Sequence, residues 1–177
     1  MGSGRDEGRM AQMVTALARL TALAGGVVLV VLVVLTSVSV SGRALAGLGF
    51  GPVAGDFELV EIGTAFAIFC FLPWCHLTGG HARVDLLAER LGPAAGRLLG
   101  LFADGLMLAA AVLIAWRLWL GMLDKLAYHE TTFIREIPLW WAYAASLAGA
   151  GVFVVVAAWC LWRSFAGPAR RAAVPVD

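Results

Sequence analysis

The chain has 177 residues, of which 61% are hydrophobic and 14% are charged, and its formal net charge at pH 7 is +1. Its mean hydropathy of +0.87 lies far above the values of soluble domains, so the composition excludes an ordinary soluble protein. The net charge itself says nothing about partners, whereas the placement of the charges is informative. We expect no nucleic-acid partner.

Four apolar stretches follow one another along the chain, and each is about as long as a membrane-spanning helix. The first, residues 20–40, contains no charged residue, and at about 1.5 Å per residue it spans ~31 Å, close to the thickness of the hydrocarbon layer. It is too long for the apolar region of a signal peptide, so we interpret it as a retained span. Backbone groups in lipid must be satisfied internally, which favours helices over strands. The other predicted spans are residues 57–77, 94–120 and 139–162.

The distribution of cations predicts how these spans are oriented. Nine of the 13 Lys and Arg residues lie in the two terminal segments and in or beside the connection 78–93. The Lys and Arg residues of the connections 41–56 and 121–138 are Arg43, Lys125 and Arg135. Because positively charged connections stay in the cytoplasm, we predict one all-α membrane domain over residues 1–177, with four spans and both termini cytoplasmic.

Tryptophans mark both ends of the fourth span. Trp141 and Trp162 are ~32 Å apart along a straight helix with a rise of about 1.5 Å per residue. Tryptophan is enriched at both membrane interfaces. We therefore predict that one helix connects an outer and an inner aromatic girdle.

A short amphipathic helix is predicted over residues 81–91, between the second and third spans. Gly79-Gly80 precedes it, and Gly92-Pro93 is expected to start the next helix. Its apolar residues recur with helical spacing, so it should lie in the headgroup plane. The like charges Asp85 and Glu89 indicate cationic partners elsewhere, although a simple solvated face is the alternative. The apolar side consists of Val84, Leu87, Ala88 and Leu91.

Several charged residues are predicted at the outer boundary of the membrane. Asp56, Glu58 and Glu61 begin the second span, and Arg43 ends the first. We predict that Arg43 pairs with Glu58 or Glu61 and so joins the first two helices, because a carboxylate facing lipid is costly. Solvation of these groups at the interface is the alternative.

Asp104 is the most deeply placed charged residue of the third span, ~10 Å beyond Arg97 at about 1.5 Å per residue. A carboxylate at this depth needs a partner. The candidates are the Trp159 indole, Arg163 or a second protein subunit. A proton or ion site is the alternative, and a single carboxylate without a polar lining disfavours it.

The sequence contains no pattern typical of an enzyme. The spacing of the cysteines does not match a zinc or redox site, and there is no supported phosphate loop, paired-carboxylate site or Ser-His-Asp arrangement. The histidines are expected at the membrane edges, not facing each other within the bundle as bound haem requires. We therefore predict no catalytic residue, no metal ligand and no cofactor. The cysteines in question are Cys70, Cys75 and Cys160, and the histidines are His76, His81 and His129.

Several segments resemble the small membrane subunit (DctQ-like) of tripartite ATP-independent periplasmic transporters, called TRAP transporters. The most specific is GGHARVDLL within the run FLPWCHLTGGHARVDLL, where Trp74 replaces a tyrosine that is frequent in related sequences. The order and spacing of the segments carry the resemblance, which extends from the first span to the end of the fourth. The segments are Gly42-Arg43, Pro52, GDFELVE at 55–61, the long run at 71–87 and IPLWW at 137–141.

The resemblance implies a component of a secondary transporter in a bacterial or archaeal cytoplasmic membrane. Its expected partners are a large permease subunit that carries the substrate and sodium sites, a periplasmic protein that captures an organic acid, and membrane lipid. Residues expected in structural pairing or subunit contact are Arg43, Glu58, Glu61, His81, Arg83, Asp85 and Asp104. Residues expected to dock the periplasmic protein are Asp56, Lys125, Glu130 and Arg135.

Three other classes of membrane protein compete with this interpretation. A small autonomous exporter also has four helices, but its coupling requires a carboxylate deep in the first span, and residues 20–40 contain none. A redox membrane anchor is disfavoured by the histidine positions. A generic accessory membrane protein would be distinguished by what copurifies with it. The substrate pocket of the transporter is expected in the larger partner.

Overall fold

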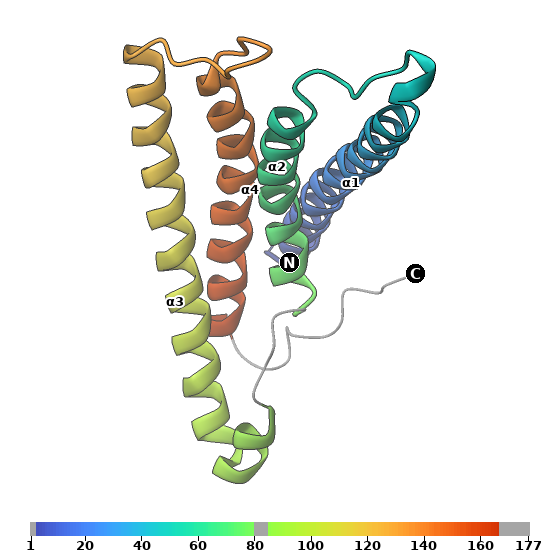
Figure 1. Cartoon of the computed structure of the whole chain (residues 1–177). Coiled ribbons are helices and arrows are strands. Elements are labelled where there is room, and N and C mark those ends of the chain that lie inside the picture. The colour runs from blue at the N-terminus through green and yellow to red at the C-terminus, as the bar shows by residue number, and fades with distance from the viewer. Residues whose placement is uncertain (1–2, 80–84, 167–177) are drawn as a thin grey trace.

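The computed structural model describes residues 3–79 and 85–166, which form helices joined by connections (Figure 1). The helices are α1 (Ser3–Ala44), α2 (Asp56–Leu77), α3 (Asp85–Ala127) and α4 (Leu139–Ala166), with a short 3-10 helix, η1 (Ala46–Leu48). Each of the four long helices contains a stretch long and apolar enough to cross a membrane. The predicted all-α fold with four spans is confirmed.

Two helices extend well beyond their predicted apolar stretches. α1 begins at Ser3, and α3 runs without interruption through Gly92 and Pro93, where the sequence predicted a new start. The ribbon of α3 changes direction near its beginning (Figure 1), as expected where a proline removes a hydrogen bond from a helix. Residues 80–84 lie outside the described residues. A position in the headgroup plane for the helical residues 85–91 stays a prediction.

The four helices form an open layer and not a closed bundle. Within the described residues, the backbone of α3 lies close to α4 alone, α4 also packs on α2 and α1, and α1 packs on α2 (Figure 1). In a closed four-helix bundle, every helix would contact two neighbours around one shared core. Here the described part of α3 packs along one side, against α4. It therefore forms one edge of the layer.

Two glycines allow the helices to approach closely. A Cβ atom built at Gly149 of α4 would lie 2.9 Å from the backbone carbonyl carbon and oxygen of Phe69 in α2. A Cβ at Gly25 of α1 would lie 2.9 Å from the Cβ of Cys70. Small residues at such crossings let membrane helices pack through their backbones, and these two contacts hold α2 between its neighbours.

The buried core is small and is centred on α4. Ala111 of α3 packs with Phe153 and Ala157 of α4, and Met107 and Leu108 cover this cluster. In the most apolar 18-residue stretch of α3, 6% of the residues are buried within the chain, against 33% in α4. Most of the apolar surface of α3 therefore faces outward, toward lipid or another protein.

Candidate functional site

Both long connections lie at one end of the layer, where α1 and α3 end and where α2 and α4 begin (Figure 1). We call this the outer end. It contains the connection 45–55 and the connection 128–138. Seven of the predicted site residues belong to this end, so its contacts decide which of them can act together.

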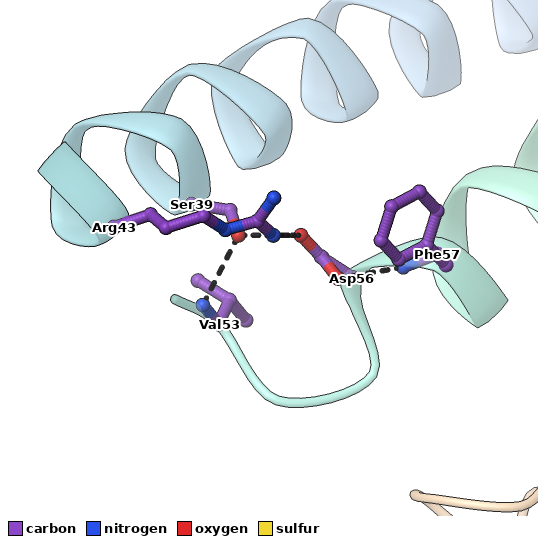
Figure 2. A network of polar contacts seen from close by, with 5 residues as sticks. All are labelled: Ser39, Arg43, Val53, Asp56 and Phe57. Atoms are coloured by element: carbon purple, nitrogen blue, oxygen red, sulfur yellow. Dashed lines mark hydrogen bonds and ion pairs between the residues drawn. The ribbon is translucent and has the colours of Figure 1, made fainter. Parts of the chain in front are cut away.

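A buried serine organises the first connection. The hydroxyl of Ser39, which is inaccessible to solvent, donates to Oδ2 of Asp56 at 2.5 Å and accepts a hydrogen bond from the backbone N–H of Val53 at 3.2 Å (Figure 2). The other carboxylate oxygen, Oδ1, accepts from the N–H of Phe57 at 2.9 Å. Asp56 is thereby fixed between the end of α1 and the beginning of α2. Ser39 was not among the residues predicted from the sequence.

Arg43 also contacts this carboxylate. One guanidinium nitrogen lies 3.3 Å from Oδ2 of Asp56 (Figure 2). Arg43 lies one helical turn after Ser39, so both side chains reach the same group. The predicted link between α1 and α2 is present, but the predicted partners Glu58 and Glu61 are wrong, because the ion pair is made with Asp56. The Arg43 side chain is 54% exposed, and exposed ion pairs contribute little stability.

Glu58 holds the second connection instead. Its carboxylate accepts hydrogen bonds from the backbone N–H groups of Ile134 at 2.7 Å and Arg135 at 3.1 Å. Residues 131–138 form a compact loop, which we call the outer turn. Within it, the N–H of Thr132 donates to the carbonyl of Ile137 at 3.0 Å, and the N–H of Ile137 donates to the hydroxyl of Thr132 at 3.1 Å. A side chain of α2 thus fixes the connection between α3 and α4.

The two connections also touch directly. The Nε–H of Arg135 donates to the carbonyl oxygen of Ala54 at 2.9 Å. Gly55 has φ +73, a conformation that favours glycine, and a Cβ there would lie 2.7 Å from Cγ of Arg135. The outer end is therefore one connected platform, built from both connections and the first turn of α2.

The remaining predicted residues of the outer end are two docking candidates, Lys125 and Glu130, and one residue predicted for structural pairing, Glu61. Nζ of Lys125 lies 2.5 Å from a carboxylate oxygen of Glu130, so these two residues form an ion pair beside the outer turn. Glu61 is exposed one turn below Glu58 on α2. All four predicted docking residues, including Asp56 and Arg135, therefore participate in contacts that shape the platform.

Asp104 lies away from this platform, toward the opposite end of α3 and α4. The hydroxyl of Ser164, a largely buried residue of α4, donates to its Oδ2. Ser164 was not among the donors proposed from the sequence. Of the other predicted contact residues, His81 and Arg83 lie outside the described residues, whereas Asp85 begins the helical backbone of α3.

Within residues 3–79 and 85–166, no group of three or more His, Cys, Asp or Glu side chains stands in a position to hold a metal ion. The contacts at the outer end are structural hydrogen bonds and ion pairs between helix termini and connections. Such an arrangement can present a shaped surface to another molecule.

Comparison with known proteins identifies the family. The model of the DctQ component of tripartite ATP-independent periplasmic transporters matches residues 32–167, most of the chain. The chain belongs to this family. It is thus a small component of a TRAP transporter, from a family of transporter components and not of enzymes. The matched region of this DctQ component includes part of every helix. No curated protein and no solved structure matches the chain significantly.

Proposed function

We propose that this DctQ component supports the large, sodium-coupled permease subunit of its transporter and helps a periplasmic substrate-binding protein to dock during uptake of an organic acid. It acts in a bacterial or archaeal cytoplasmic membrane with both termini in the cytoplasm. The outer end then faces the periplasm.

The open helix layer is the observation that carries this proposal. Within the described residues, the backbone of α3 lies close to α4 alone, and Ala111, Phe153 and Ala157 pack between these two helices. A transporter that acts alone needs a substrate site lined by polar groups and enclosed by helices. A layer with an apolar core and broad apolar faces is better suited to lie against a larger membrane protein.

The outer end supports the docking role. Glu58 and Arg135 join the connections 45–55 and 128–138 into one platform. Functional surfaces are commonly loops held by a rigid scaffold. Asp56, Lys125, Glu130 and Arg135 shape this platform and influence docking through its geometry.

His81, Arg83 and Asp85 are assigned to contact with the large subunit on the opposite side of the membrane. This assignment rests on the family resemblance of the GGHARVDLL segment. The segment 81–91 would then act as a brace in the headgroup plane.

Coexpression and reconstitution test the proposal. The tagged chain should copurify with a large permease subunit encoded beside it. Proteoliposomes containing both chains should take up radiolabelled organic acid only with the soluble binding protein and an inward sodium gradient. Omitting the small chain should abolish uptake. The proposal is wrong if the large subunit transports equally well without this chain, or if this chain alone moves solute.

A further inference from the structure

The outer turn presents two apolar side chains at its tip. Phe133 is fully exposed, with a relative accessibility of 101%, and Ile134 is 62% exposed. Their neighbours Arg135 and Glu136 are also exposed. An aromatic side chain that buries no surface within its own chain contributes nothing to folding by burial. Its placement therefore calls for an explanation outside this chain.

The tip is held in place by contacts that order its backbone. Two adjacent backbone N–H groups, those of Ile134 and Arg135, are bound by the carboxylate of Glu58. Thr132 contributes both its N–H and its hydroxyl to Ile137. A surface whose conformation is fixed before binding loses less entropy on association. The turn thus presents Phe133 as a preorganised contact.

From the position of the turn in the chain, we expect its tip to lie outside the hydrocarbon layer. Trp140 and Trp141, whose ring centroids are 5.2 Å apart, follow it in the first turn of α4, where the aromatic girdle of the outer interface is expected. The tip precedes this girdle by several residues and is bound to Glu58 near the beginning of α2. A water-soluble partner can reach it there.

Charge at the outer end indicates the chemistry of that partner. Six carboxylates but only three cations lie there. Asp56 and Glu130 are neutralised by their ion pairs, and Glu58 binds two backbone N–H groups. Glu61, Asp124 and Glu136 are exposed and belong to neither ion pair. A surface with this excess of negative charge attracts a partner whose contact face is basic.

We propose that Phe133, with Ile134 beside it, inserts into an apolar pocket surrounded by Lys and Arg residues on the periplasmic substrate-binding protein. This inference rests on the proposed function and specifies the contact within it. Glu58 is the positioning residue: it does not touch the partner, and it fixes the backbone that presents Phe133. Aromatic anchors enclosed by a polar rim commonly dominate the affinity of such interfaces.

The affinity of the complete complex tests the anchor. The small and large subunits are placed together in nanodiscs and titrated with the soluble binding protein. F133A should weaken docking by about tenfold or more, as expected for an interface hot spot. The matched control is F165A, which removes another exposed phenylalanine, 64% accessible and at the opposite end of α4, and should leave docking unchanged. Equal affinities of the two variants would overturn the proposal.

Variants of Glu58 test the positioning role separately. E58A should increase hydrogen exchange at the backbone N–H groups of Ile134 and Arg135 and weaken docking. E58Q keeps one acceptor oxygen and should recover part of both. Docking should also weaken as the salt concentration rises, because screening reduces the attraction between opposite charges. If E58A frees the amides without changing the affinity, Glu58 is not a positioning residue and this part of the proposal is wrong.

Two further results distinguish a wrong contact from a wrong function. A spin label at F133C, with Cys70, Cys75 and Cys160 replaced by alanine, should be accessible to a water-soluble relaxation agent without the binding protein and protected with it. Accessibility to oxygen but not to the soluble agent would place the tip in lipid and overturn the inference, while docking of the native complex would leave the proposed function intact. Failure of the native complex to dock at all would reject both.

Discussion

The contact between α2 and α4 can be tested by adding one methyl group. In G149A, the new Cβ would lie 2.9 Å from the backbone carbonyl of Phe69, whereas ordinary carbon contacts lie at about 3.5–4.0 Å. Backbone cannot rotate away as a side chain can, so α2 and α4 must separate. G151A, two residues further along α4, places its Cβ where nothing lies within 4 Å.

The two substitutions change the helix propensity in the same way, but only one of them overpacks a contact between helices. Replacing glycine by alanine within a helix stabilises by about 1 kcal/mol through propensity, and this applies at both positions. Overpacking of a close contact costs about 1–3 kcal/mol, and it applies at Gly149 alone. We therefore expect G151A to exceed G149A in the free energy of unfolding by about 1–3 kcal/mol.

Reversible unfolding in mixed micelles measures this difference. The purified chain is titrated with rising mole fractions of sodium dodecyl sulfate, and loss of tertiary contact is followed by tryptophan fluorescence. The original chain and both variants are compared under identical conditions. Unfolding free energies for G149A and G151A that agree within about 0.5 kcal/mol would refute the close backbone approach of α2 and α4.

Three further predictions use the same titration. S39A should lower the free energy of unfolding by about 1–3 kcal/mol, because it removes the hydrogen bonds of the Ser39 hydroxyl with Oδ2 of Asp56 and with the N–H of Val53. R43Q should cost less than about 1 kcal/mol, and the reverse order would contradict the assigned network. G55A should destabilise more than G49A, since both residues have positive φ but a Cβ meets Arg135 only at Gly55; equal losses would mean that only backbone conformation matters. S164A should lower the free energy of unfolding by about 1–3 kcal/mol, because the hydrogen bond to Asp104 is lost. S41A, at an exposed position, should change it by less than about 0.5 kcal/mol. Similar values for both variants would count against the Asp104 contact.

The spans could be predicted because hydropathy and length are direct consequences of the lipid environment. α2 was expected over residues 57–77 and occupies Asp56–Leu77, since a charged residue and Thr78-Gly79 delimit it. α1 was underestimated because its polar first turns carry no hydropathy signal, although their backbone is helical from Ser3. The open layer could not be predicted, since hydropathy does not indicate which apolar side contacts which neighbour.

Which residues pair in the polar contacts of the outer end depends on how the connections fold. Asp56, Glu58 and Glu61 all lie within reach of Arg43 by sequence, and the fold of residues 45–55 brings Asp56 to it while Glu58 faces the outer turn. Hydroxyl groups in apolar helices commonly bond to their own backbone, as Thr36 and Ser37 do with the carbonyls of Leu32 and Val33. The sequence alone therefore gave no reason to select Ser39 or Ser164 as donors to a carboxylate.

In the part of the chain that the structure describes, the backbone of α3 lies close to α4 alone, and this has a consequence for how the chain is made. During synthesis, α1 and α2 can associate as soon as both have entered the membrane, because they pack on each other. α3 enters next, but the helix on which it packs is synthesised last. Until α4 leaves the ribosome, α3 is held near its neighbours only by the chain itself, so the final span completes the assembly of half of the molecule.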